Sequence, residues 1–136
     1  MSINWFPGHM VKARREIEEN IKLVDIVVML LDARAPISCR NPELEKLVAR
    51  KKVFLVLNKM DLADRNALRK HIASLRAEGF AVAAMDSISG KGKREVLQGI
   101  SESYQSFADA MLQKGRRVRP ARVMVVGVPN IGKSTF

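Results

Sequence analysis

The sequence has few aromatic residues, a single cysteine and no long apolar run. Aromatic residues make up 5% of its 136 residues, which gives little support to a stacking platform for single-stranded nucleic acid. One cysteine, Cys39, excludes an internal disulfide framework and suits the cytoplasm. The longest apolar runs, such as IVVMLL, are too short to cross a bilayer as a helix, and no secretory signal is apparent. We therefore expect one cytoplasmic domain, or part of one, with no membrane partner.

Negative charge is also scarce. The chain has 24 Lys and Arg residues against 14 Asp and Glu residues, a net charge of +10. This excess predicts a polyanionic partner, and a basic surface without such a partner is the alternative. The basic stretch Lys114 to Arg122 is either a solvated connector or a segment that contacts phosphates. The hydrophobic content of 47% is typical of a globular domain.

Four apolar runs and the segments between them predict an α/β fold. The runs are rich in Val, Ile, Leu and Met and are continuous instead of alternating, which indicates parallel strands buried on both faces. Helical patterns separate them, so the fold class is a parallel sheet with helices on both faces. Strands are expected at Asp25–Ala33, Lys52–Asn58, Phe80–Asp86 and Arg122–Val128, and helices at Asn41–Arg50, Asp64–Glu78 and Lys93–Gln113.

Residues 1–24 form a separate N-terminal segment that contains a predicted amphipathic helix, packed on the sheet domain or on a partner. Arg14 and Arg15 lie near the start of this helix, where the helix dipole disfavours cations unless an anion docks there. They are also spaced to form surface ion pairs with Glu18 and Glu19, and both interpretations stay open. The apolar residues that recur at helical spacing are Met10, Ala13, Ile17, Ile21 and Val24.

The last ten residues, GVPNIGKSTF, match the phosphate-binding pattern G-x-x-x-x-G-K-S/T. Gly127 and Gly132 permit backbone angles that aim N–H groups at phosphate oxygens. Lys133 would reach the outer phosphates, and Ser134 would offer its hydroxyl to magnesium. An ordinary glycine-rich turn is the alternative. The residues expected to bind the phosphates are Pro129, Asn130, Ile131, Gly132, Lys133, Ser134 and Thr135.

The second expected strand ends in the sequence N-K-x-D, Asn58 to Asp61, at the sheet edge where ligands of open α/β sheets bind. Asp61 could accept hydrogen bonds from the N1–H and the exocyclic amine of guanine, whereas adenine offers neither donor there. Base contacts of this kind discriminate by about 1–3 kcal/mol. Asn58 could bond the other edge of the base or brace the phosphate loop, and the stem of Lys59 could cover the ring. The alternative is a strand-end turn capped by Asp61.

Two further strand-end loops lie near the expected site. In the loop Asp86 to Lys91, Ser87 is the first candidate, ahead of Ser89, for a backbone contact to the guanine oxygen. A helix N-cap by Ser89 is an equally good interpretation. The loop Asp32 to Pro36 follows the first strand, and we favour a structural role in which Asp32 and Arg34 pair.

Four segments resemble the circularly permuted GTPases of the YlqF/RbgA type, bacterial factors for assembly of the large ribosomal subunit. In this family the guanine-reading motif precedes the phosphate loop, although both occupy their usual places in a TRAFAC-class P-loop fold. The resemblance implies that the phosphate-loop strand lies beside the strand near Asp25, followed by those near Lys52 and Phe80. The segments are WFPGHMVKARREI, LLDARAPISCRNP, LNKMDLAD and GVPNIGKSTF.

The resemblance also implies roles for single residues. Asn130 matches an asparagine that holds a monovalent cation, potassium, beside the phosphates. His9 matches the family's candidate for arranging the attacking water, and a structural role for it is equally open. Lys133 is the second expected catalytic residue.

Switch segments and an RNA-contacting C-terminal domain, which the resemblance implies, are not in the sequence. We therefore expect an N-terminal fragment in which residues 25–136 are a partial GTPase domain, truncated after the phosphate loop. Loss of two strands would leave the sheet edge beside the phosphate-loop strand open.

The leading hypothesis is a monomeric GTPase that uses GTP, magnesium and potassium and binds ribosomal RNA during late assembly of the large (50S) subunit. The full-length protein would hydrolyse GTP to GDP, and the fragment alone would be inactive. An RNA-binding module that never hydrolyses GTP is the alternative. An ATP-using phosphate-loop enzyme is a third possibility, against which N-K-x-D argues.

Overall fold

The structure, a computed structural model, is an α/β sheet domain. It describes residues 2–4, 10–36, 40–86, 88–115 and 122–127. The strands are β1 (Ser2–Asn4), β2 (Ile26–Asp32), β3 (Lys52–Asn58), β4 (Ala81–Ala84) and β5 (Val123–Gly127). The helices are α1 (Met10–Asn20), α2 (Pro42–Val48), α3 (Arg65–Ala77) and α4 (Lys93–Gln113), with the short 3-10 helices η2 (Ile21–Leu23) and η3 (Met60–Leu62).

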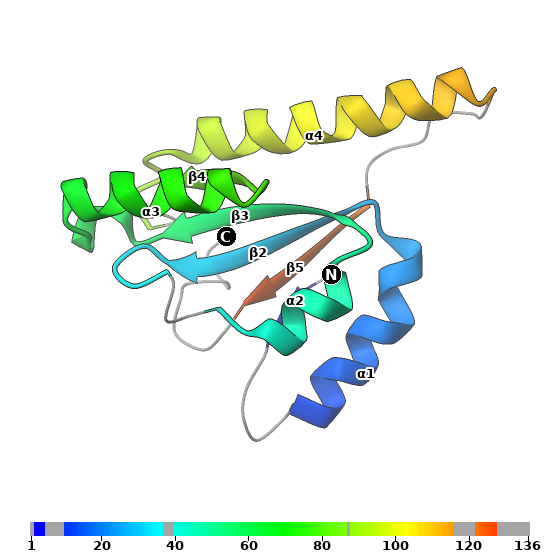
Figure 1. The fold of residues 1–136 in the computed structure, drawn as a ribbon, viewed down its shortest axis with the longest axis horizontal. Helices are drawn as coiled ribbons and strands as arrows, with labels where there is room; N and C mark the ends of the chain where they lie inside the picture. The colour runs from blue at the N-terminus through cyan, green and yellow to red at the C-terminus, as the bar shows by residue number, and fades with distance from the viewer. Residues whose placement is uncertain (1, 5–9, 37–39, 87, 116–121, 128–136) are drawn as a thin grey trace.

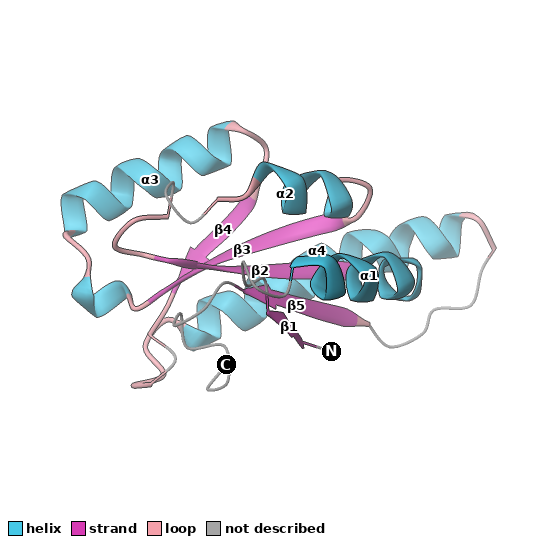
Figure 2. Cartoon of the chain, turned by 90° about the horizontal axis from the view of Figure 1, so that it is seen from below, coloured by secondary structure: helices cyan, strands magenta, loops and turns pink. Residues whose placement is uncertain are grey.

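The strands form one sheet in the order β1-β5-β2-β3-β4, and each neighbouring pair is parallel (Figure 1 and Figure 2). The order β5-β2-β3-β4 confirms the predicted arrangement. The prediction that the sheet edge beside the phosphate-loop strand is open is wrong, because β1 pairs with β5 there. With three residues, β1 is too short for its pattern of apolar residues to indicate a strand.

Helices cover both faces of the sheet, as the continuous apolar runs predicted (Figure 2). Val27, Met29 and Leu31 of β2 pack in a core with residues of α1, α2 and α3. Ile26, Val28 and Leu30 face the other way and share a second core with Val96 and Ile100 of α4. Every residue of β2 is therefore buried, which is why its sequence does not alternate.

Side-chain caps set the starts of two helices. The Asn41 side chain accepts a hydrogen bond from the Leu44 N–H at 3.1 Å, and Pro42 occupies the first turn of α2. The Asp64 side chain accepts from the Ala67 N–H at 3.0 Å at the start of α3. Both helices begin and end within two residues of the predicted limits, and α4 has the predicted bounds.

The helix α1 packs on the sheet, the first of the two predicted alternatives. Ala13 and Ile17 lie in the same core as the strand residues. Arg14 forms an ion pair with Glu43 at the start of α2, not the pair with Glu18 that its spacing suggested. Within the described ranges, no helix combines the length and apolar character needed to span a membrane.

Candidate nucleotide site

The carboxyl ends of β5, β2 and β3 lie at one edge of the sheet. Asp32 and Asn58 are register partners at the ends of β2 and β3, and Gly127 at the end of β5 is level with Leu30. Neighbouring strands lie about 4.8 Å apart, so β3 and β5 are separated by about 10 Å. This spacing is on the scale of one nucleotide, so a single ligand could reach from N-K-x-D to the residues after Gly127.

The chain leaves β3 through a residue in an uncommon conformation. Asn58 is 1% exposed, and its carbonyl accepts a hydrogen bond from the Ala33 N–H at 2.7 Å. Lys59 has φ of 62°, the left-handed region, and among the described residues it is the one non-glycine with positive φ. Such a conformation costs of order 1–3 kcal/mol and is found more often at functional sites than elsewhere. It turns the chain sharply from β3 into η3.

Asp61 lies in η3 and caps neither neighbouring helix. The N-cap of η3 is Lys59 and that of α3 is Asp64, so Asp61 is the N-cap of neither helix. The Asp61 side chain is 42% exposed, and its Oδ1 lies 3.3 Å from the Nζ of Lys91 in the β4–α4 loop. The carboxylate is therefore oriented towards the loop that was expected to close over the base.

Backbone hydrogen bonds hold the β4–α4 loop beside N-K-x-D. The Met85 N–H donates to the Leu57 carbonyl at 2.9 Å, and the Met60 N–H donates to the Met85 carbonyl at 3.1 Å. Asp86 shapes the loop itself, because its Oδ1 accepts from the Ile88 N–H at 3.1 Å. That hydrogen bond is the main reason why the pKa of Asp86 lies below its ordinary value.

Of the two serines of this loop, the structure describes Ser89 but not Ser87. The predicted N-cap role of Ser89 is wrong, because the N-cap of α4 is Gly92. The Ser89 hydroxyl instead accepts a hydrogen bond from the Lys91 N–H at 3.3 Å. Ser87, the first candidate for contacting the guanine oxygen, lies outside the described residues.

The predicted pairing of Asp32 with Arg34 is confirmed. The Arg34 Nη2 lies 2.6 Å from Asp32 Oδ2, and its Nε lies 3.0 Å from Oδ1. The Arg34 backbone N–H also donates to Oδ1 at 2.9 Å. These hydrogen bonds, above all those from the Arg34 side chain, lower the pKa of the buried Asp32 against the effect of its burial. Asp32 therefore fixes the loop after β2.

Much of the predicted site lies outside the described residues: His9, Ser87, Pro129, Asn130, Ile131, Gly132, Lys133, Ser134 and Thr135. The expected convergence of Asp61 and Lys133 on one nucleotide therefore stays a prediction. In the part of the chain that is described, no three His, Cys, Asp or Glu side chains gather to hold a metal ion. Sequence reasoning did not identify the contact of Lys91 with Asp61, because no local spacing links residues 30 positions apart.

Known proteins similar to this chain include ribosome biogenesis and ribosome-associated GTPases. No protein-family model matches the chain. It is 41% identical to ribosome biogenesis GTPase A of Bacillus cereus over 136 residues, all of this chain and 46% of that protein. It is 36% identical to mitochondrial ribosome-associated GTPase 1 of Bos taurus, over 97% of this chain and 39% of that protein. The chain thus spans about half the length, or less, of these relatives.

Two solved structures share the fold. The GNP-bound YlqF from T. maritima has a TM-score of 0.68 and 32% identity, over 91% of this chain and 45% of that one. A GDP-bound YlqF structure has a TM-score of 0.66 and 31% identity, over 89% of this chain and 45% of that one. These similarities confirm the predicted fold class, an α/β circularly permuted P-loop GTPase fold.

Proposed function

We propose, from the premise that this chain is YlqF/RbgA-like over its whole length, that it binds GTP and GDP as part of a ribosome-assembly GTPase. The observation that carries the proposal is the placement of N-K-x-D. It follows β3 at the sheet edge where β5 also ends, with β2 alone between them. The names of the relatives, and the GNP and GDP bound in the two YlqF structures, support the same ligand.

Asn58, Lys59 and Asp61 would recognise the base. The Asp61 carboxylate is exposed and offers acceptors to the two donors on the guanine edge. Asn58 is buried and would brace the loops around the base, while the aliphatic stem of Lys59 would lie along the ring. A backbone N–H at Ser87 would complete the contact to the guanine oxygen.

The phosphates would lie on the residues after Gly127. Lys133 would neutralise charge on the outer phosphates, with the backbone of Pro129 to Thr135 around them. The Ser134 hydroxyl and the Asn130 side-chain oxygen are hard ligands that suit magnesium and potassium, ions that would offset charge developing in phosphoryl transfer. His9 would orient the attacking water. Hydrolysis belongs to the whole protein, and residues 25–136 would supply the nucleotide-binding part, with residues 1–24 as an N-terminal addition.

The proposed partner is the ribosome, in particular ribosomal RNA of the large subunit, bound by a monomer in the cytoplasm. The relatives are named for ribosome biogenesis or association with the mitochondrial ribosome, and the net charge of +10 favours a polyanion. The same charge supports the alternative function, an RNA-binding module without hydrolysis. GTP turnover at saturating RNA distinguishes the two.

Base selectivity tests the proposed function. In competition against a fluorescent GDP analogue, GTP should displace the probe and ATP should not. Asp61→Asn should weaken GTP and favour xanthosine triphosphate, because an amide can donate to the xanthine oxygen. The measurement is made on the chain and on the full product of its gene. Unchanged GTP affinity in the variant would contradict the assignment of Asp61.

A further inference from the structure

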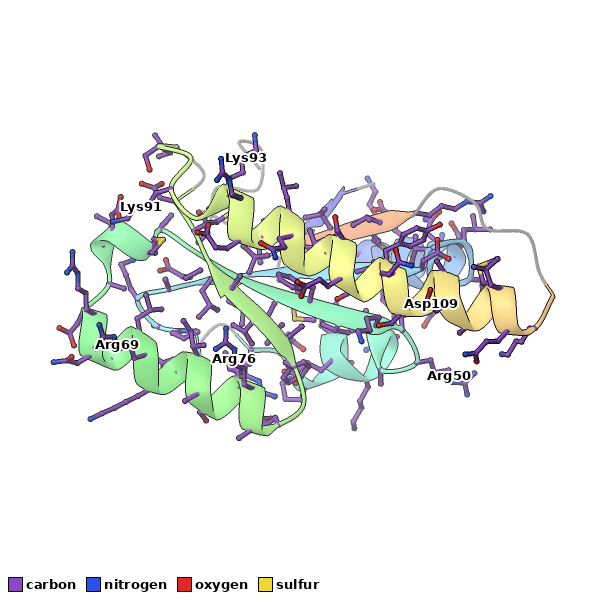
Figure 3. All side chains as sticks on the ribbon, turned by 90° about the horizontal axis from the view of Figure 1, so that it is seen from above. Arg50, Arg69, Arg76, Lys91, Lys93 and Asp109 are labelled. Atoms are coloured by element: carbon purple, nitrogen blue, oxygen red, sulfur yellow. The ribbon has the colours of Figure 1, made fainter. Side chains whose placement is uncertain are left out.

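The cation nearest to the proposed base-reading carboxylate in the described structure is Lys91. Its Nζ lies 3.3 Å from Asp61 Oδ1, and the two side chains are 59% and 42% exposed. They come from different loops, Asp61 from the segment after β3 and Lys91 from the segment before α4. Lys91 and Lys93 both lie at the end of the molecule where α4 begins (Figure 3).

The backbone of Lys91 is fixed, although its side chain is exposed. The Lys91 carbonyl accepts from the Asp86 N–H at 2.8 Å, and its own N–H donates to the Ser89 hydroxyl at 3.3 Å. Gly90 and Gly92 on either side have φ of 82°. These restraints hold the backbone end of the Lys91 side chain beside Asp61, while the four-carbon stem of that side chain can still turn.

Lys59, the cation within N-K-x-D itself, pairs with a different carboxylate, that of Asp32. The Nζ of Lys59 lies 4.0 Å from Asp32 Oδ2, on the β2 side. Lys91 approaches Asp61 from the β4 side. The carboxylate expected to read guanine is thus the one that Lys91 contacts.

We propose that Lys91 is a gate on guanine binding: its ammonium occupies the Asp61 carboxylate in the empty site and must leave before the base can bind. This proposal rests on the proposed function. The ammonium lies at Asp61 Oδ1, one of the two oxygens that the guanine donors would use, and its charge weakens the carboxylate as an acceptor. When guanine binds, the exposed Lys91 side chain turns away from Asp61 towards solvent.

The gate should act mainly on the association rate. Opening an exposed ion pair costs little, since such pairs contribute about 0.2–1 kcal/mol, so its removal should speed association by about 1.4- to 5-fold. The dissociation rate should change less, because the ammonium has already left in the bound state. A purely structural role for Lys91 would not change the association rate more than the dissociation rate.

Stopped-flow binding of fluorescent GDP and GTP analogues to the full gene product tests the gate. Lys91→Gln should speed association by about 1.4- to 5-fold and tighten binding by a similar factor. Lys91→Arg should keep the wild-type rate, since it keeps a cation. Lys93→Gln is the matched control, an equal charge change two residues away, and should leave the rate unchanged or slightly slower. In an Asp61→Ala background, Lys91→Gln should have no effect.

Two outcomes would separate the gate from the proposed function. If Lys91→Gln slows association as much as Lys93→Gln or more, Lys91 attracts the nucleotide and the gate is refuted, while guanine selectivity still stands. If the wild type binds ATP as tightly as GTP, the proposed function fails, whatever the effect of Lys91.

Discussion

Asp32 and Asn58 lie opposite each other as the last register pair of β2 and β3. Asp32 fixes its own loop through Arg34, and Asn58 is the first residue of the N-K-x-D sequence. The Asn58 carbonyl accepts the Ala33 N–H at 2.7 Å, so the two loops leave the sheet tied together. The candidate base site therefore depends on the loop after β2, to which this backbone hydrogen bond ties it.

Removal of the Arg34 side chain should destabilise the fold near neutral pH. Arg34→Ala leaves the buried Asp32 carboxylate without its bidentate partner, and we expect a loss of about 1–3 kcal/mol in the free energy of unfolding. The measurement is urea unfolding followed by circular dichroism. An unchanged midpoint would contradict the importance of the pair.

The same pair should make stability depend on pH. The pKa of Asp32 is lowered in the folded state from a value of 3.8, so its contribution is present above that pH and is lost as pH falls through the lower folded value. The difference between wild type and Arg34→Ala should therefore shrink as the pH is lowered below 3.8. A difference that stays constant down to pH 2.5 would contradict this linkage.

Two glycines of one loop should respond differently to alanine. Gly90 and Gly92 both have φ of 82°, but a Cβ at Gly90 meets nothing within 4 Å, whereas one at Gly92 lies 2.3 Å from the Ala84 carbonyl oxygen. Gly90→Ala should cost about 1–2 kcal/mol for the left-handed backbone alone. Gly92→Ala should cost clearly more, because β4 must also shift. Equal melting temperatures of the two variants would contradict the close approach.

Arg40 ties the start of α2 to the end of α3. Its guanidinium forms ion pairs with Glu45 at 2.6 Å and with Glu78 at 2.6 Å. It also lies 5.6 Å from the centre of the Phe80 ring. Arg40→Lys should lower the melting temperature, since lysine lacks the planar fork. Glu45→Gln should lower it more than Glu78→Gln, because the Glu45 side chain is 23% exposed and that of Glu78 43%. The reverse order would contradict this ranking.

The excess of positive charge predicts RNA binding that weakens with salt. A complex with two phosphate contacts should lose about tenfold in affinity between 50 and 200 mM salt, and one with more contacts should lose more. Filter binding of a ribosomal RNA fragment across that series measures the slope. An affinity independent of salt would contradict RNA binding through phosphate contacts.

Sequence reasoning succeeded where the physical signal is local. The strand Lys52–Asn58 and the helix Lys93–Gln113 were predicted with the observed bounds, because burial on both faces and a 3.6-residue period leave strong patterns. The pair of Asp32 with Arg34 was also predictable, since the two residues are neighbours in one loop. The order of the strands came from the family resemblance and not from these patterns.

The sequence by itself determined that β2 to β5 become strands and α1 to α4 become helices, and which strand ends carry the chemical groups of the candidate site. Only the tertiary structure decided that β1 pairs with β5, that Arg14 meets Glu43, and that Lys91 contacts Asp61. These contacts join residues far apart in the chain, and no period of 2 or 3.6 residues encodes them. They form because the packed sheet brings distant loops and termini to the same place.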